Sequence, residues 1–444
     1  MKKTSKNRTL PAVVIGKIKE LRTKLYDSIQ EACELIPYLC NDPARDFTRT
    51  RMLPFGRVIL HILAFHNDST QNEIFDLYDQ EEVAPTKSAL IQQRHKIKPE
   101  AFDFLFHKFL GKVKLNEAFQ GFSLQACDGS VINLPRNPAD SETSVQAKPG
   151  AKSYNRIHLN ALYDLQNKVY VDYKIDNGAH MKELDALYDM AERIPDPEHT
   201  ILTADRGYGC FNAFAFLNKL HCHFVIRVKD ITSTTSLTRQ LNLPDEEFDR
   251  DIDIILTKSH KKIYREDPRY VVLNQHDSFE YFDDSGFANL SFRIVRLRLS
   301  TGEYETVFTD LSRDMFSCDD ICQIYHLRWG IETSFEELKY ALDLVYFHSK
   351  QYDFVIQELI AHLVMYNVYS LMSQSVPDKN NPKLKHVYKV NFMPTIKTLR
   401  QFFLWGSTDI LSHLLYNMNP VRKARSVPRG NLHDTKPAKS FNYR

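Results

Sequence analysis

The sequence predicts an α/β protein in which a mixed β-sheet is preceded and followed by helices. Three observations carry this prediction. Residues 15–111 and 318–418 have apolar residues at helical spacing, and the segment between about 122 and 175 alternates apolar and polar residues as strands do. From residue 180 to residue 229 helices and strands then take turns, which is typical of an α/β core.

The helical N-terminal region contains two short helices around a turn, and the second starts near Pro85, a favoured first-turn residue. This second helix is expected to expose five polar or basic side chains: Lys87, Gln92, Gln93, Arg94 and Lys96. Two interpretations stay open for the helix pair, a recognition helix for a DNA major groove or an ordinary helical hairpin.

The sheet is expected to begin with three antiparallel strands, because two alternating segments flank a turn at residues 164–167. The next elements are a helix near 180–193, a strand at 199–204, a helix near 211–220 and a strand at 223–229. Residues 230–311 hold more strand-like segments with Asp-Ser-Gly and Thr-Gly turns, which we interpret as a β-rich insertion.

Three more helices are expected after the insertion, at 318–344, 352–374 and 395–418. The most apolar window, 354–372, contains four polar side chains, so no membrane span is expected. We therefore divide the chain into five parts: a helical N-terminal region 1–118, a first core part 119–229, the β-rich insertion 230–311, a second core part 312–350 and a helical C-terminal region with a basic tail 351–444.

Composition excludes several classes of protein. With 43% hydrophobic and 12% aromatic residues, the 444-residue chain is neither disordered nor of low complexity. Its seven scattered cysteines favour reduced thiols in a cytoplasmic protein. The net charge of +2 does not indicate what kind of partner the protein binds. Both ends of the chain, however, are basic: residues 1–24 contain eight Lys or Arg and one acid, and residues 421–444 contain seven Lys or Arg and one acid. A solvated tail explains these ends as well as a polyanionic partner does.

One predicted helix carries four polar residues on a narrow face. At about 100° per residue, Tyr325, Arg328, Glu332 and Lys339 fall within a stripe roughly 60° wide, beside the apolar face of the helix. A solvated face with charge pairs has the same pattern. Glu336 lies close enough to this stripe to be an alternative functional carboxylate.

Two further acids stand at the ends of predicted strands or among small residues. Asp128 lies in Ala-Cys-Asp-Gly-Ser, whose small side chains leave room for a ligand, and Asp205 ends an apolar strand before Gly207. Together with a carboxylate from the helix they supply the oxygen ligands that two divalent ions need to act on a phosphodiester.

These residues resemble the DDE transposases of the insertion-sequence-4 family. That family carries the signature Tyr-(2)-Arg-(3)-Glu-(6)-Lys, which is matched at every spacing by Tyr325, Arg328, Glu332 and Lys339. Its second catalytic Asp is followed by a Gly-Tyr or Gly-Phe pair, as Asp205 is followed here by Gly207 and Tyr208. Its first catalytic Asp lies on the first strand of the core, which matches Asp128. In organisation the resemblance extends over about 400 residues.

The resemblance implies a ribonuclease H-like core and a particular set of site residues. Two Mg²⁺ ions, for which Mn²⁺ would substitute, would be bound by the catalytic acids Asp128, Asp205 and Glu332. DNA phosphates would be held by Tyr325, Arg328 and Lys339. Some members also use a Trp of the insertion to stack on a base. The two Trp residues here lie outside it, so the stacking candidates are Tyr264, Tyr270, Tyr281 and Phe282.

The implied function is cut-and-paste transposition of DNA. The expected partners are double-stranded DNA, as terminal inverted repeats and as target, and a second copy of the chain in a synaptic complex. The expected location is the cytoplasm, with nucleoid association when DNA is bound. Two alternatives stay open, a two-metal nuclease without strand transfer and a non-catalytic, domesticated DNA-binding protein.

Overall fold

The computed structural model describes residues 10–421, apart from 50, 79–82, 147, 149, 179–180, 300–301 and 381–383. Most of the predicted basic C-terminal tail and the first nine residues therefore lie outside the described residues. The structure is a mixed α/β fold with a large central sheet and helices on both faces, which confirms the predicted fold class.

The core of the sheet has a ribonuclease H-like strand order. Five strands lie in the order β4-β3-β1-β5-β6: β4 (Val169–Asn177), β3 (Tyr154–Asp164), β1 (Ser123–Leu134), β5 (Thr200–Ala204) and β6 (His223–Val228). The first three pair antiparallel, as the hairpin turn predicted, and the last two run parallel to β1. The short strand β2 (Ser144–Val145) pairs with β3 at the edge.

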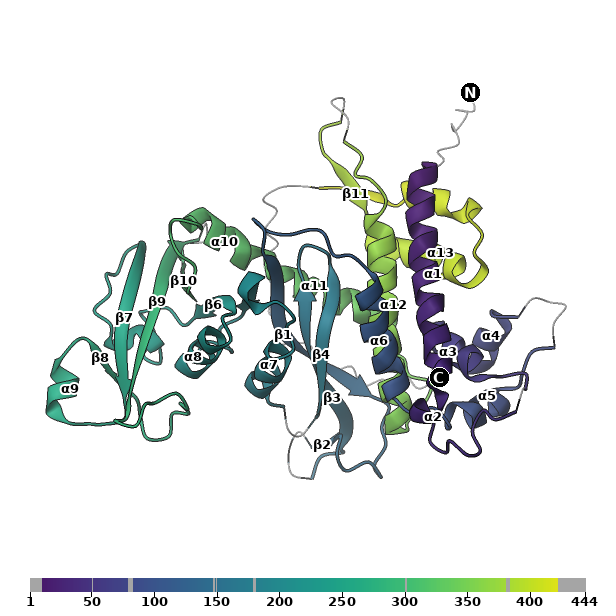
Figure 1. Cartoon of the computed structure of the whole chain (residues 1–444), viewed down its shortest axis with the longest axis horizontal. Helices are drawn as coiled ribbons and strands as arrows, with labels where there is room; N and C mark the ends of the chain where they lie inside the picture. Colours follow the sequence, from purple (N-terminus) through teal and green to yellow (C-terminus); the bar gives the residue numbers. More distant parts are fainter. Residues whose placement is uncertain are drawn as a thin grey trace.

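The segment predicted as a β-rich insertion continues this same sheet (Figure 1). From β6 the order goes on through β10 (Tyr304–Thr309), β9 (Phe287–Arg298), β7 (Phe248–Thr257) and β8 (Tyr270–Val272). Between β6 and β10 the pairing is antiparallel, with Val307 opposite Arg227. The short helix α9 (Lys262–Glu266) and the 3₁₀ turn Leu237–Gln240 complete the segment. The division of the chain into five parts stays a prediction.

Helices cover the two faces of the core. On one face lie α7 (Glu183–Ala191) and α8 (Phe211–Lys219), and on the other α11 (Trp329–Tyr340) and α12 (Tyr352–Gln374) (Figure 1). Leu124 and Ala126 of β1 belong to the hydrophobic cluster on the α11 and α12 side, whereas Cys127 belongs to the cluster on the α7 and α8 side. Because strand side chains alternate between faces, Asp128 shares the α11 face with Ala126.

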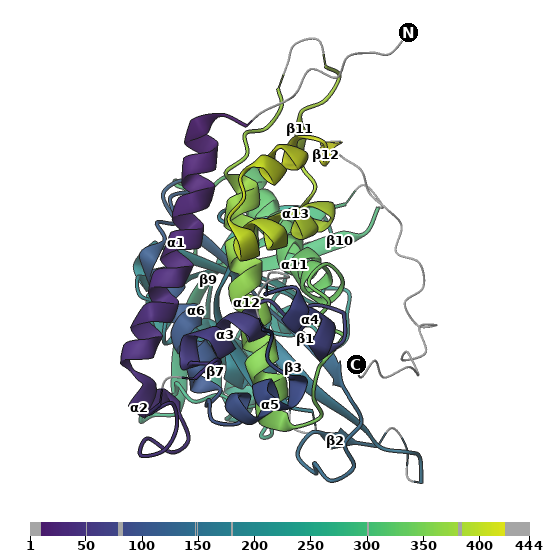
Figure 2. The same cartoon turned by 90° about the vertical axis from the view of Figure 1, so that its right-hand side faces the viewer.

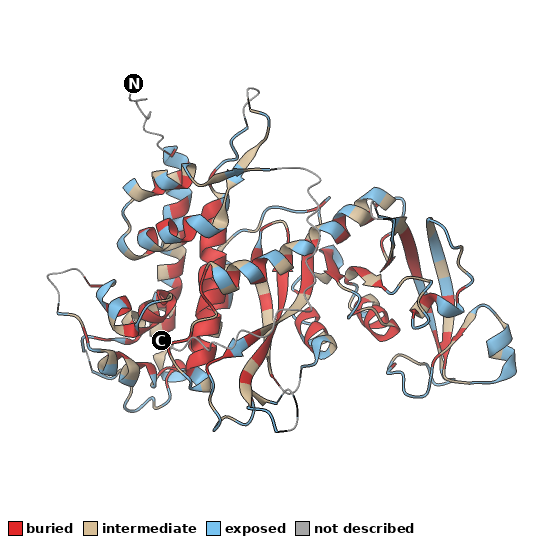
Figure 3. Ribbon diagram, turned by 180° about the vertical axis from the view of Figure 1, so that it is seen from behind, coloured by how far each residue is buried: buried red, intermediate tan, exposed pale blue. Residues whose placement is uncertain are grey.

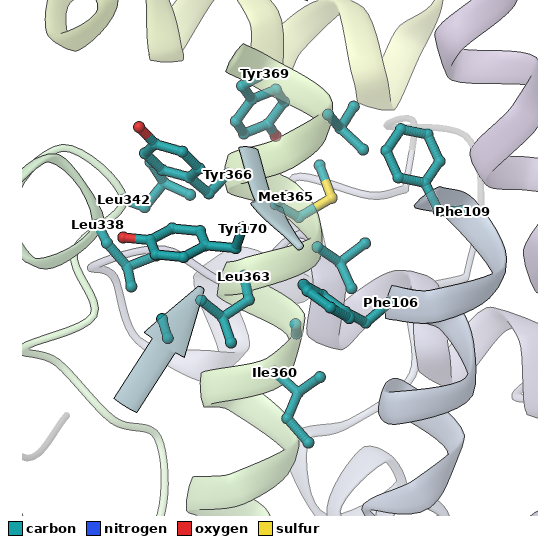
Figure 4. Packing of buried hydrophobic residues seen from close by; sticks show 14 of the residues in the cluster. Phe106, Phe109, Tyr170, Leu338, Leu342, Ile360, Leu363, Met365, Tyr366 and Tyr369 are labelled. Atoms are coloured by element: carbon teal, nitrogen blue, oxygen red, sulfur yellow. The ribbon is translucent and has the colours of Figure 1, made fainter. Parts of the chain in front are cut away.

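The helix α12 is the centre of the larger hydrophobic cluster. Phe106 of α6, Tyr170 of β4 and Leu338 of α11 pack around it (Figure 4). Among the described residues it is the one helix long and apolar enough to cross a membrane, but 94% of its apolar window is buried inside the protein (Figure 3). Such burial is typical of the core helix of a globular fold.

The N-terminal helices are α1 (Ala12–Glu34), α2 (Ile36–Leu39), α3 (Phe55–Leu63), α4 (Thr70–Phe75), α5 (Lys87–Arg94) and α6 (Glu100–Lys112). Most of them lie on the far side of α12 from the sheet (Figure 1), but α6 also contacts the sheet, because the Tyr173 hydroxyl of β4 donates to Asp103 at 2.7 Å. One sequence expectation is wrong here. Arg94, predicted on the surface of α5, is only 3% exposed and donates to Glu358 of α12 at 2.7 Å. Nothing in the spacing of α5 reveals a partner 264 residues away.

The C-terminal region closes the helical half of the molecule. It consists of α13 (Phe392–Trp405), the 3₁₀ helix Asp409–Leu415 and a two-stranded sheet of β11 (Tyr388–Val390) and β12 (Met418–Pro420). Figure 2 shows α13 beside the upper part of α1, where Arg22 Nε donates to the carbonyl of Phe403 at 2.8 Å.

Candidate active site

Two of the predicted acids lie on neighbouring parallel strands. Cys127 of β1 is in register with Ala204 of β5, so the residues that follow them, Asp128 and Asp205, lie side by side where β5 ends. The carboxylate of Asp205 accepts the amide of Gly207 at 2.7 Å, and its charge raises the pKa of Asp128. The fold therefore brings together two acids that are 77 residues apart in sequence.

The third acid comes from a helix that the sequence predicts as continuous from 318 to 344. The structure corrects this: α10 (Cys318–Leu327) and α11 are separate helices that meet at Arg328. The Arg328 amide donates to the Tyr325 carbonyl at 3.2 Å, an i to i−3 bond that tightens the turn. Gly330 follows, where an added Cβ would lie 2.9 Å from Leu165 in the turn after β3 and 4.0 Å from Tyr163 of β3. A close approach to the sheet at Gly330 thus accompanies the break.

Arg328 joins the helix to the strand acids. Its Nη2 donates to Glu332 Oε1 at 2.8 Å, and its Nη1 lies 3.9 Å from Asp128 Oδ2. Ser130, two residues after Asp128 and on the same face of β1, accepts the Lys339 Nζ at 2.8 Å. These contacts place Asp128, Arg328, Glu332 and Lys339 between β1 and α11.

An open cavity of about 370 Å³ lies at this junction. Its wall includes Asp128, Ser130, Glu332, Glu336 and Lys339. Glu336, the alternative carboxylate, is exposed on this wall. Glu332, and not Glu336, bonds Arg328 and acts electrostatically on Asp128.

The electrostatics of the site favour a cation. Burial raises the pKa of Asp128 to about 6, and the charges of Asp205 and Glu332 act in the same direction, against the Gly129 amide and Arg328. A carboxyl group with such a pKa is partly protonated near neutral pH. A divalent cation would replace that proton, because it stabilises the ionised form.

Arg328 is a buried cation with unused hydrogen-bonding capacity. It is 3% exposed, and among the described residues neither its Nε nor its Nη1 has a hydrogen-bond partner. Its guanidinium lies over the rings of Tyr325 and Trp329, 5.4 and 4.9 Å from their centroids. Buried donors without acceptors are costly, so the group is poised for an anionic ligand.

The two remaining predicted residues differ in their positions. Tyr325 is 2% exposed, and burial raises the pKa of its hydroxyl, so it lies beneath Arg328 rather than on the cavity wall. Lys339 does line the cavity, and burial lowers the pKa of its ammonium group.

His158 lies next to the acids, although nothing in the sequence analysis predicts it there. An added Cβ at Gly129 would lie 2.2 Å from His158 Nε2, so the imidazole packs directly against Gly129. His158 Nε2 in turn lies 3.2 Å from Glu183 Oε1 of α7. This pair is on the opposite face of β1 from the cavity, because Gly129 and Asp128 point to opposite faces. Only the pairing of β1 with β3 brings His158 to this place.

The donor set suits a hard divalent cation, since carboxylate oxygens are the ligands that Mg²⁺ prefers. Within the described ranges, however, no group of three or more His, Cys, Asp or Glu side chains is close enough together to hold a metal ion. The guanidinium of Arg328 lies between Asp128 and Glu332 instead. Metal binding by all three acids therefore requires Glu332, whose side chain is 36% exposed, to turn away from Arg328.

Comparisons with known proteins identify the family of the chain. The family described as "Transposase DDE domain" matches residues 120–368, from the start of β1 into α12. A cryo-EM structure of a piggyBac transposase synaptic complex with hairpin DNA is similar at 8% identity and a TM-score of 0.43, over 90% of this chain and 81% of that one. We base no argument on a similarity of that size. No curated protein matches the chain. The family match spans more than half of the sequence and all six predicted site residues, and the chain belongs to the transposases with a DDE domain.

Proposed function

We propose that this protein is a transposase of the insertion-sequence-4 type, which cuts DNA at the ends of its element and joins the freed ends to target DNA. Membership of the DDE family supports DNA transposition in general. One observation carries the proposal further: a buried arginine with unused donors lies between two acids, Asp128 and Glu332, that line an open cavity.

In this proposal the acids Asp128, Asp205 and Glu332 hold two Mg²⁺ ions, with Mn²⁺ as a substitute. When bound, such ions activate water or a 3′-hydroxyl and neutralise charge on the leaving oxygen. The acids orient that cation pair from two rigid strands and one helix.

The basic residues position the DNA strand. When Glu332 turns away from Arg328, the guanidinium loses its hydrogen bond to Glu332 Oε1 and offers a planar set of donors to a phosphate. Tyr325 supports the guanidinium from below, and Lys339 supplies a point charge about three helical turns beyond Arg328. Arg328 thus exchanges a carboxylate for a phosphate.

The proposed function implies the partners of the protein and its location in the cell. The proposed substrates are terminal inverted repeats and target DNA, held by two copies of the chain in a synaptic complex in the cytoplasm. Helix α5 and the basic ends are proposed to contribute to DNA binding, although Arg94 takes no part in it because it is buried.

The test uses a DNA fragment that carries this gene with its flanks, incubated with the purified protein in Mg²⁺ or Ca²⁺. We expect excision and joining in Mg²⁺ only. Glu332→Gln should bind DNA but cut it more than about a hundredfold more slowly, since it removes a metal ligand. Glu336→Gln is the matched control, because Glu336 lines the same cavity but makes no bond to Arg328.

Each other outcome points to a different function. Cutting without a joined product favours the nuclease, and binding without cutting under any metal favours the non-catalytic protein. Equal cutting by the wild type and Glu332→Gln contradicts the assignment of Glu332 and moves attention to Glu336.

A further inference from the structure

A second polar cavity lies in the N-terminal helical region. It has a volume of about 260 Å³ and opens where the loop formed by residues 42–49 and 51–53 meets the end of α5, a helix on the far side of α12 from β1 (Figure 1). Its lining includes four cationic side chains and no carboxylate: Arg45, Arg49, Arg51 and Lys96 are the cations, with Gln93 and Thr48 beside them. We call this the cationic pocket.

The pocket is held by hydrogen bonds between the loop and the segment after α5. The amide of Asn41 donates to the Lys96 carbonyl at 2.9 Å, and Asn41 Nδ2 donates to the His95 carbonyl at 2.6 Å. An isolated bridge pairs Cys40 with Ile97 in the same place. The start of the loop is therefore fixed relative to Lys96.

Phe47 gives the loop its shape. Its φ of +55° is left-handed, a conformation that a residue with a bulky side chain rarely adopts. Its ring packs edge-on against Phe55 of α3 at 5.3 Å, and Lys96 Nζ lies 5.7 Å from the ring centroid. Backbone strain of this kind persists only where the surrounding contacts impose it, and it is often found at binding sites.

The charges of the pocket have few partners in the protein. Arg49 and Arg51 form no ion pair or hydrogen bond within the part of the chain that the structure describes, and both are exposed. Arg45 reaches only Asp42, at 3.8 Å, and its side chain is 86% exposed. By contrast every nitrogen of the guanidinium of Arg94, the residue next to Gln93, is hydrogen bonded to the protein. Four cations around one cavity favour a polyanion.

We propose that the cationic pocket binds backbone phosphates of duplex DNA and forms a second DNA contact, apart from the acids. This inference rests on the proposed function, since a transposase must hold DNA beyond the bond that it cuts. Arginine forks match phosphate oxygens, and such contacts place a duplex without reading its sequence. The loop would follow the DNA backbone while the acids act on the end of the element.

The experiment measures binding of a 30-base-pair duplex of mixed sequence to the full-length chain in Ca²⁺, by fluorescence anisotropy over a range of chloride concentrations. The test variant is the pair Arg49→Gln, Arg51→Gln. The control pair, Lys262→Gln with Arg265→Gln on α9, removes the same charge from exposed residues outside the pocket. We expect the test pair to bind more weakly, with a salt slope shallower by about 2, because about one unit is lost per phosphate contact. The control pair should keep the wild-type slope.

Two further readouts separate this inference from the proposed function. At saturating DNA the test pair should cut in Mg²⁺ at the wild-type rate, because the acids are untouched. A wild type that neither binds nor cuts DNA overturns the proposed function itself. A cutting wild type with an unchanged salt slope in the test pair, or an equal loss in the control pair, overturns the pocket alone. Displacement of the duplex by inorganic phosphate, but not by chloride of equal ionic strength, would show a small-anion site and also overturn it.

Discussion

Arg94 and Arg328 are equally buried, at 3% exposure, yet their surroundings differ. Arg94 uses every nitrogen: Nε donates to Gln357 at 2.8 Å, Nη1 to Glu358 at 2.7 Å and Nη2 to the Phe354 carbonyl at 2.6 Å. Arg328 uses only Nη2. The first is satisfied by the protein, and the second needs something that the protein does not supply. Unused donors, rather than burial, distinguish the arginine that we propose to bind a phosphate.

Arg94 belongs to an ionic network that joins the N-terminal helices to α12. Glu358 also accepts the amide of His348 at 3.0 Å, and His348 Nε2 lies 3.6 Å from Glu73 of α4. Burial disfavours the charged forms, but Arg94 and His348 outweigh it and hold the pKa of Glu358 at about 2. In the same way Glu358 and Glu73 raise the pKa of His348 to about 10. Charges of both signs are matched in this network.

The largest effect is expected from breaking the satisfied network. Arg94→Met should lower the free energy of unfolding by about 3–5 kcal/mol, because it leaves Glu358 buried without its main counter-charge. Urea unfolding followed by circular dichroism measures this. Arg94→Met combined with Glu358→Gln should lose less than Arg94→Met alone. If Arg94→Met were as stable as the wild type, the hydrogen bonds of Arg94 would not be structural, and the contrast with Arg328 would be wrong.

A smaller effect is expected from substituting Arg328, and it should appear in the rate of DNA cutting rather than in the free energy of unfolding. Arg328→Met should slow DNA cutting by about a hundredfold, because a phosphate loses its planar donor set. Its free energy of unfolding should change by no more than about 1 kcal/mol, since the variant removes donors that the protein leaves unused. Cutting rates and urea unfolding on the same preparations decide this. A loss of stability as large as that of Arg94→Met would mean that Arg328 is structural.

The smallest effect is expected from a change in pH, which tests the role of His348 in the ionic network around Glu358. The pKa of His348 is about 10 in the folded protein, against an ordinary value of 6.5. The stabilisation of the folded protein by the charged His348 is therefore complete below about pH 6.5, and it is lost as the pH rises through 10. Between pH 7 and 9 the free energy of unfolding should fall by about 1 kcal/mol per unit. His348→Gln should show a flatter profile over this range; an equal slope in both proteins would show that another group titrates.

Much of the candidate site was predictable because it depends on local order and spacing. The signature on α10 and α11 identifies Arg328 and Glu332 as neighbours one turn apart, and the structure has them hydrogen bonded. The break at Arg328 was not predictable, because the periodicity of the apolar residues continues across it. The burial of Arg94 and the contact of His158 with Gly129 were not predictable either, since both depend on elements that are distant in sequence.

The sequence by itself determined the α/β class and most of the order of elements, because apolar periodicity is a local property of the chain. The spacing of the signature residues and their resemblance to a family led to the proposed acids and their basic companions. The tertiary structure alone decided that strands β7 to β10 extend the core sheet, and that the same residue type serves as a structural link at Arg94 and as an unsatisfied donor at Arg328. The physical reason is that strand pairing and the satisfaction of a buried charge are set by partners which only the fold brings into contact.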